Sequence, residues 1–173
     1  MYFSITSKAG DALRAIHNIN NSGVELKIIN IDEDKTNGVH CSADCQQLID
    51  LMTDYYAKVG FNKPWAGYFV VDNNQVMGTG GFTAQPKAGK VEISYWTFKE
   101  FEGQGIGSFS CKELIAISKQ QDPAITITAK TAPLHNASTR ILQKNGFEFS
   151  ETVQDHEIGD AWLWILKPGE CNR

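Results

Sequence analysis

Three glycines at alternate positions precede an apolar segment near the middle of the chain, in the stretch EFEGQGIGSF from Glu100 to Phe109. Because glycine has no side chain, such a stretch lets a ligand approach the main chain and permits dihedral angles that other residues avoid. The stretch lies between an expected strand and an expected helix, and the first turn of a helix carries unpaired N–H groups and partial positive charge. This arrangement favours a phosphate-binding loop. A glycine-rich turn that only redirects the chain explains the glycines equally well.

Two familiar nucleotide-binding loops do not fit the spacing of these glycines. A dinucleotide fingerprint reads GxGxxG, but Gly107 follows Gly105 after one residue and Ser108 holds the next position. A Walker A loop reads GxxxxGK[ST], and no lysine follows these glycines directly. A nucleotide-dependent oxidoreductase is therefore disfavoured, and the phosphate ligand must be of another kind.

The elements that position this stretch follow from hydrophobic periodicity and turn residues. Helical spacing predicts helices over residues 10–20, 42–60, 108–120 and 136–147, and 32–38 reads as a loop. Alternating or β-branched runs predict strands over 24–31, 65–71, 75–83, 91–98, 124–130, 147–153 and 160–167. This order indicates an α/β (α+β) fold with a mixed sheet and at least one βαβ unit. No linker or repeat divides the sequence, so we expect a single domain over residues 1–173.

Composition and charge indicate which classes of partner and which cellular compartment to expect. The formal net charge of −4 argues against nucleic acid or an anionic membrane as the main partner. The first residues lack a secretory signal, and no apolar run approaches the roughly 20 residues needed to span a bilayer, so we expect a cytoplasmic protein. The cysteines lack CxxC spacing, which favours reduced thiols. His40, Cys41 and Cys45 lie close in sequence but lack a fourth ligand, so no metal is expected.

Three motifs resemble the GNAT superfamily of acetyl-CoA-dependent N-acetyltransferases. EGQGIG, from Glu102 to Gly107, is similar to the pyrophosphate loop [RQ]xxGx[GA] of that family, with Glu102 in place of Arg or Gln. NASTRILQKNGFEF, residues 136–149, is similar to a later motif of the family. VEISYWTF, residues 91–98, resembles the EIGYW strand of the ribosomal-protein N-terminal acetyltransferase branch, in which the first loop position varies. The resemblance covers roughly residues 65 to 166.

The resemblance implies a fold and a cofactor site. The fold would have a central mixed sheet of about seven strands, a splay between the fourth and fifth strands, and flanking helices. Acetyl-CoA would be the co-substrate, without a metal. Its pyrophosphate would bind the backbone amides of Gln104, Gly105, Ile106, Gly107 and Ser108. Asn136 would hydrogen-bond the pantetheine arm or the backbone beside it, although its suitability as a helix N-cap explains this residue without any ligand. The backbone of Trp96 and Phe98 would pair with pantetheine in the splay, with the Trp96 amide closest to the thioester oxygen.

The same resemblance implies direct transfer of acetyl to a primary amine. Glu92 is the candidate general base, acting through water, because partial burial in an apolar strand would make it a better proton acceptor. A solvent-facing or ion-paired strand residue is the alternative interpretation of Glu92. Ser138 is the candidate acid toward the leaving thiolate, unless it only completes the first turn of its helix. Both roles depend on how the strands and helices meet.

The acceptor is less well determined by the sequence. A protein N-terminus, a polyamine, an amino-sugar drug and a small metabolite amine all remain open. Tyr55, Tyr56, Phe61 and Trp65 lie in the segment that shapes the acceptor site in related enzymes. Two-fold pairing is common among relatives, so a homodimer is one expectation. The alternative function is a module of the same fold that senses acyl-CoA and transfers nothing.

Overall fold

The structure, a computed structural model, describes residues 23–34 and 42–169. The helix predicted over residues 10–20 lies outside the described residues, as do His40 and Cys41. The elements in chain order are β1 (Glu25–Ile28), α1 (Ile31–Asp34), α2 (Ala43–Val59), β2 (Gly67–Asp72), β3 (Gln75–Phe82), β4 (Lys90–Thr97), a 3₁₀ turn η3 (Lys99–Phe101), α3 (Ile106–Gln121), β5 (Thr126–Thr131), α4 (Ala137–Lys144), β6 (Glu148–Asp155) and β7 (Gly159–Leu166). Within the described part of the chain, no helix is both long and apolar enough to cross a bilayer.

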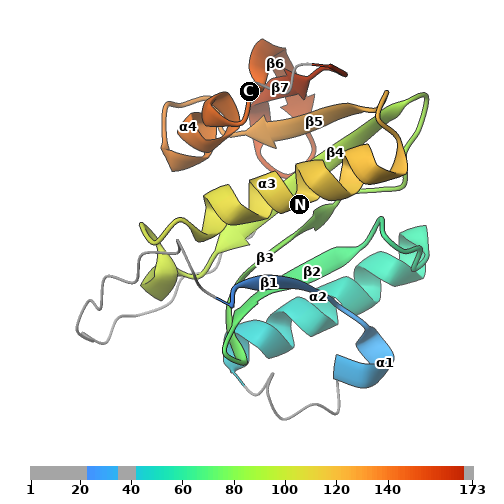
Figure 1. The fold of residues 1–173 in the computed structure, drawn as a ribbon, viewed down its shortest axis with the longest axis vertical. Helices are drawn as coiled ribbons and strands as arrows, with labels where there is room; N and C mark the ends of the chain where they lie inside the picture. The colour runs from blue at the N-terminus through green and yellow to red at the C-terminus, as the bar shows by residue number, and fades with distance from the viewer. Residues whose placement is uncertain (1–22, 35–41, 170–173) are drawn as a thin grey trace.

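A single seven-stranded sheet organises the molecule, with strand order β1-β2-β3-β4-β5-β7-β6 (Figure 1). Strands β1 to β4 form an antiparallel meander. The β2–β3 turn is made by Asn73 and Asn74, both with positive φ, of 47° and 65°. Asparagine tolerates this conformation, and two such residues in succession match the twist of a tight hairpin. The local sequence therefore determines the turn that brings β3 beside β2.

The mixed character of the sheet arises between β4 and β5. These strands are parallel and pair only over Lys90–Glu92 with Thr126–Thr128, and α3 forms the crossover between them. Beyond Glu92 the strands part, while β5 continues antiparallel to β7 and β7 to β6. The predicted mixed sheet with a splay between its fourth and fifth strands is thus confirmed.

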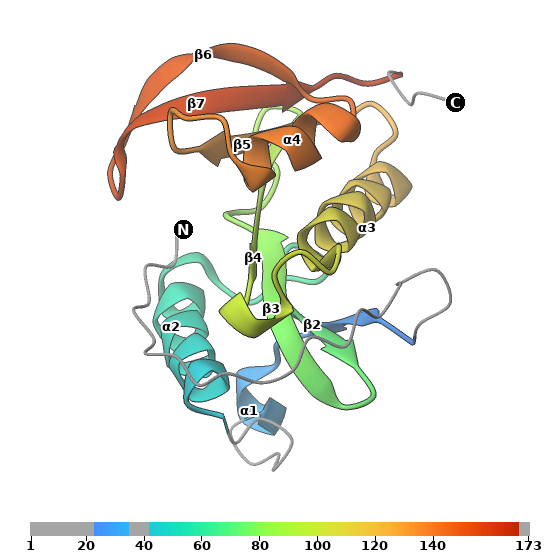
Figure 2. The ribbon, with the colours of Figure 1, turned by 90° about the vertical axis from the view of Figure 1, so that its left-hand side faces the viewer.

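Helices cover both faces of the sheet. Figure 2 shows α2 and α3 on opposite sides of β2, β3 and β4, while α4 lies beside β5 and β7. On the α3 side, the core contains Ile93 of β4, Leu114 of α3 and Ile127 of β5, all at most 2% exposed. On the α2 side, Leu48 of α2 and Phe69 of β2 belong to a second core cluster. Side chains of β4 alternate between the two cores, as a strand buried on both faces requires.

Some boundaries differ from the sequence-based expectation. The segment predicted as a loop over residues 32–38 begins inside a short helix, α1. Helix α3 starts at Ile106 instead of residue 108, because Gly105 adopts φ 87° and provides the left-handed residue that turns the chain into the helix. Helix α2 begins as expected at Ser42, whose side chain accepts a hydrogen bond from the Cys45 amide at 3.2 Å.

Candidate functional site

A cavity of about 480 Å³ lies where the end of β4, the start of α3 and helix α4 meet. We call it the α3 cavity. Its walls come from the glycine stretch and from two elements distant in sequence. The lining residues are Tyr95, Trp96, Thr97, Phe101, Glu102, Gly103, Gly105, Ile106, Gly107, Ser108, Ala137, Ser138, Arg140, Ile141 and Lys144. The predicted loop residues Gly105, Ile106, Gly107 and Ser108 are therefore brought to one hollow.

The start of α3 presents main chain to this cavity. No side chain caps the helix, and its first internal hydrogen bond runs from the Phe109 amide to the Gly105 carbonyl at 2.9 Å. The amides of residues 106–108 therefore have no partner within the helix. A Cβ added at Gly107 would lie 3.1 Å from Ile141 Cδ1 and 3.5 Å from Thr97 Oγ1, so glycine keeps this corner open. A bare helix N-terminus with these features suits the diphosphate of coenzyme A.

Two basic residues of α4, which the sequence analysis did not assign, also line the α3 cavity. Arg140 and Lys144 are four residues apart and so lie on one face of the helix. The sequence could have indicated these two residues, because they are four positions apart in the segment that resembles the cofactor-flanking helix of the family. Glu102 lines the same cavity and is exposed. Helix α4 thus brings two positive charges to the same lining that carries the Glu102 carboxylate.

Other predicted residues lie at the edges of this cavity or outside its lining. Ser138 lines it, and its carbonyl accepts a hydrogen bond from the Tyr95 hydroxyl at 3.5 Å. Asn136 caps α4: its side chain accepts from the Thr139 amide at 3.1 Å, and its own amide donates to Thr139 Oγ1 at 3.0 Å. The Gln104 side chain donates to the Glu100 carbonyl at 3.2 Å. Neither Asn136 nor Gln104 is part of the lining.

The register of β4 changes which of its residues direct their main-chain groups toward the splay, compared with the expectation of Trp96 and Phe98. The Phe98 amide donates to the Met77 carbonyl at 3.0 Å, and the Glu92 carbonyl accepts from the Thr83 amide at 3.0 Å. Peptide groups alternate in direction along a strand, so Trp96, paired with Thr79, also directs its N–H and C=O toward β3. The peptide groups that face β5 and the splay belong to the odd-numbered residues.

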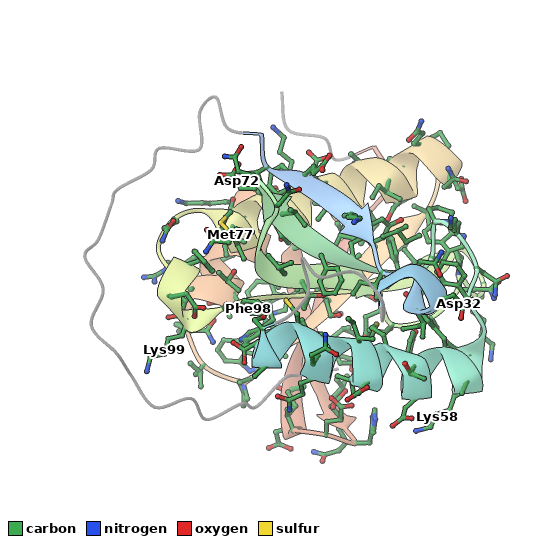
Figure 3. All side chains as sticks on the ribbon, turned by 90° about the horizontal axis from the view of Figure 1, so that it is seen from below. Asp32, Lys58, Asp72, Met77, Phe98 and Lys99 are labelled. Atoms are coloured by element: carbon green, nitrogen blue, oxygen red, sulfur yellow. The ribbon has the colours of Figure 1, made fainter. Side chains whose placement is uncertain are left out.

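Tyr95 and Thr97, and not Trp96 and Phe98, therefore direct main-chain groups toward the splay. Phe98 is also absent from the lining of the α3 cavity: its side chain is 2% exposed and packs in a tilted arrangement against Trp96, with ring centroids 4.9 Å apart. Figure 3 labels Phe98 near the N-terminal end of α2 and Lys58 near its C-terminal end. The sequence could not fix this parity, because it depends on which residue of β3 each residue of β4 faces.

A second cavity, of about 260 Å³, lies on the opposite face of the sheet, between α2, β3 and the β6–β7 turn. We call it the α2 cavity. Its floor is the glycine-rich strand β3, and its rim carries charged side chains. The lining residues are Met52, Tyr55, Lys58, Val59, Gly67, Thr79, Gly80, Gly81, Phe82, Thr83, Ser94, His156 and Glu157. Both cavities thus use β4, the first through residues 95–97 and the second through Ser94.

Of the four aromatic residues predicted near the acceptor, Tyr55 lines the α2 cavity. Its hydroxyl donates to the carbonyls of Thr83 and Phe82. Burial raises the pKa of Tyr55, and the negative charge of Glu92 raises it further. The other three serve packing or lie at the surface: Tyr56 donates to the Ile29 carbonyl, Trp65 packs edge-on against Phe82, and Phe61 is 39% exposed.

Glu92 takes part in an ion pair. Its carboxylate lies 3.3 Å from Lys130 Nζ, and the same ammonium lies 3.0 Å from Asp155 Oδ2. The Glu92 side chain is 24% exposed. The carboxylate that lines the α2 cavity directly is Glu157, on the β6–β7 turn. Sequence analysis did not select Glu157, because a turn glutamate carries no pattern that distinguishes it from a solvated one.

Comparison with known proteins places this geometry in a class. The sequence profile described as the Acetyltransferase (GNAT) domain matches residues 26–148. The chain belongs to the GNAT family and is an acetyltransferase of that family. A search of curated proteins finds no match.

Solved structures share the fold at low identity. The RimL ribosomal L7/L12 alpha-N-protein acetyltransferase in complex with coenzyme A is 15% identical, with a TM-score of 0.62 over 86% of this chain and 96% of that one. The ribosomal-protein-S5-alanine acetyltransferase from Vibrio fischeri is 15% identical, with a TM-score of 0.60 over 87% and 96%. An acetyl transferase from Salmonella typhimurium that modifies the N-terminal serine of L7/L12 is 19% identical, with a TM-score of 0.55 over 72% and 73%. These likenesses establish the fold.

Proposed function

We propose that the chain transfers acetyl from acetyl-CoA directly to the α-amine of a protein or peptide, without a covalent enzyme intermediate. The observation that carries the proposal is the α3 cavity, which opens on the uncapped, glycine-lined start of α3 beside the parted strands β4 and β5. The amides of residues 105–108 would bind the diphosphate, and Arg140 and Lys144 would add positive charge. Pantetheine would follow β4 along Thr97 into the splay.

The acceptor would enter from the other face of the sheet, through the α2 cavity. This cavity is smaller than the ~300–1,000 Å³ typical of pockets that enclose drug-sized ligands, which disfavours an amino-sugar drug. A chain terminus can place its amine and first side chain in such a pocket while the rest stays outside. The similar enzyme from Salmonella typhimurium is described as modifying an N-terminal serine, which is an acceptor of this kind, and the one from Vibrio fischeri as acting on an alanine of ribosomal protein S5.

The reaction needs a proton acceptor on the amine side and a proton donor on the thiol side. As the amine nitrogen bonds to the thioester carbon, its proton would pass through water to a carboxylate. Glu92 is the candidate from the sequence, and Glu157 is a second candidate because it lines the α2 cavity. As the carbon–sulfur bond breaks, the Ser138 hydroxyl would donate a hydrogen bond to the leaving thiolate and relay a proton to it from water, so that the serine ends the step as a hydroxyl, since Ser138 lines the α3 cavity.

The experiment that tests the proposal measures free thiol release from acetyl-CoA with a panel of amines. The panel contains synthetic peptides that begin with serine, alanine or proline, spermidine, and an amino sugar. We expect release with the serine or alanine peptides and none with the proline peptide, whose secondary amine is the matched control. Tight coenzyme A binding without thiol release from any amine would instead support the acyl-CoA sensor. Release with spermidine alone would overturn the peptide acceptor.

A further inference from the structure

Three charged side chains meet where β4 and β5 part. Glu92 is the last residue of β4 in the parallel pairing with β5, opposite Thr128. Lys130 lies two residues further along β5, beyond the end of this pairing, and its ammonium reaches back to the Glu92 carboxylate at 3.3 Å. The ion pair therefore spans the two strands at the point where the splay begins.

The same ammonium binds the turn between β6 and β7. Lys130 Nζ lies 3.0 Å from Asp155 Oδ2. The other carboxylate oxygen, Oδ1, accepts hydrogen bonds from the backbone amides of Glu157 at 2.9 Å and Ile158 at 3.4 Å. Asp155 thus uses one oxygen to hold the turn and the other to bind Lys130. Because Glu157 lines the α2 cavity, the ion pair reaches the cavity wall through Asp155 and the turn.

Partial burial makes these contacts more than a surface ion pair. The side chains of Lys130 and Asp155 are 25% and 9% exposed. Burial raises the pKa of Asp155, but the hydrogen bond from the Glu157 amide and the ion pair with Lys130 outweigh it and bring the pKa to about 2. Burial lowers the pKa of Lys130, while Asp155 and Glu92 raise it by more. Both partners are therefore ionised at neutral pH and in direct contact.

We propose that Lys130 is a positioning residue for the acceptor side of the site. It fixes Glu92 on β4 and the β6–β7 turn in one arrangement, so that Glu157 faces the α2 cavity. The inference rests on the proposed function only for the identity of the acceptor. The geometry that it describes, a lysine that ties the turn to the fork of the sheet, exists with or without an acceptor.

The kinetic test uses Lys130→Met and a synthetic peptide that begins with serine. We expect the KM for the peptide to rise about tenfold, a change of about 1.4 kcal/mol, because the turn is no longer held in place. The dissociation constant of coenzyme A should not change, since Lys130 does not line the α3 cavity. Lys130→Arg should restore most of the loss. The matched control is Lys167→Met, which removes an exposed pair with Glu148 from the same hairpin.

A second measurement does not depend on activity. Hydrogen–deuterium exchange of the Glu157 and Ile158 amides should speed up several-fold in Lys130→Met and stay unchanged in Lys167→Met. Asp155→Asn provides a second variant, because an asparagine oxygen can still accept the turn amides while the charge is lost. It should raise the peptide KM as Lys130→Met does, with a smaller change in exchange.

The outcomes distinguish the proposed peptide acceptor from the proposed positioning role of Lys130. If the unmodified protein acetylates no peptide, the proposed acceptor is wrong, and the exchange measurement alone decides on Lys130. Unchanged exchange at the turn in folded Lys130→Met would overturn the inference. Equal loss of peptide and coenzyme A affinity would overturn it as well, because it would indicate a general structural defect.

Discussion

Glu92 and Glu157, the two candidates for the general base, lie on different elements, and only Glu157 lines the α2 cavity. Glu92 lies 3.3 Å from Lys130 Nζ, whereas Glu157 lies on the β6–β7 turn, lines the α2 cavity and lies 3.6 Å from His156 Nε2. A general base must accept a proton, and a lysine ammonium on one carboxylate oxygen competes with that role. Glu92 could still act as the general base through a water molecule bound to its other carboxylate oxygen. Replacing each glutamate with glutamine therefore tests which of the two acts as the general base.

Replacing the base with glutamine should lower kcat by about 10²- to 10⁴-fold and remove the acidic limb of the pH–rate profile. We expect Glu157→Gln to have this effect if the cavity carboxylate is the base, and Glu92→Gln if the base acts through water from β4. The affinity for coenzyme A should stay constant in both variants. Normal kcat and an unaltered profile in both would remove the two carboxylates as bases.

Asp155 links the ion pair to acid stability. Its pKa in the folded chain is about 2, against an ordinary value of 3.8. A lowered pKa means that the ionised form stabilises the fold above pH 3.8, and that this contribution is lost as the pH falls toward 2. Asp155→Asn should therefore be less stable than the unmodified protein near neutral pH.

The measurement for Asp155 is the free energy of unfolding of both proteins in urea across this pH range. The difference between them should narrow as the pH falls from about 4 to about 2. A difference that stays constant throughout would show that Asp155 does not carry this contribution.

At the scale of elements, the start of α3 is open because Gly105 and Gly107 have no side chains and no side chain caps the helix. We predict that Gly107→Val weakens coenzyme A binding at least about tenfold, since its Cβ would already lie 3.1 Å from Ile141 Cδ1 and the methyl groups must enter the cavity. Ala116→Val is the control: it places the same β-branched residue at an exposed position of the same helix.

Titration calorimetry of the two variants with coenzyme A measures this effect. Equal affinity in Gly107→Val and Ala116→Val would contradict the assignment of the loop. A loss in both would point to the helix and not to the cavity.

Elements were more predictable than the contacts between them. Alternating runs such as ITITAK and the helix caps Ser42 and Asn136 act over a few residues, so their strands and helices could be predicted. The peptide direction at Trp96 could not, because it depends on the partner residue in β3. The meeting of Lys130 with Glu92 and Asp155 likewise depends on three strands that come together only in the folded sheet.

At the scale of the whole molecule, the two cavities lie on opposite faces of one sheet and meet at β4. A cofactor held by α3 and α4 and an acceptor held by α2 and the β6–β7 turn would approach each other through the splay. Under the proposed function, the fork where the strands part directly after Glu92 is the place where the thioester and the amine would meet.

Ligand binding should therefore protect different elements. We predict that coenzyme A slows hydrogen–deuterium exchange at the start of α3 and in α4, while leaving α2 and the β6–β7 turn unchanged. At a concentration 100 times its dissociation constant, it should also stabilise the fold by about 2.7 kcal/mol. Protection centred on α2 would mean that the cofactor and acceptor faces are assigned in reverse.

The central claim is that the main chain at the start of α3 holds the diphosphate of coenzyme A. The most direct measurement is a crystal structure of the chain with coenzyme A bound. We expect diphosphate oxygens within hydrogen-bonding distance of the amides of residues 105–108, and pantetheine alongside Thr97 between β4 and β5. Coenzyme A bound elsewhere, with the Gly105–Ser108 amides turned away from it, would contradict the account.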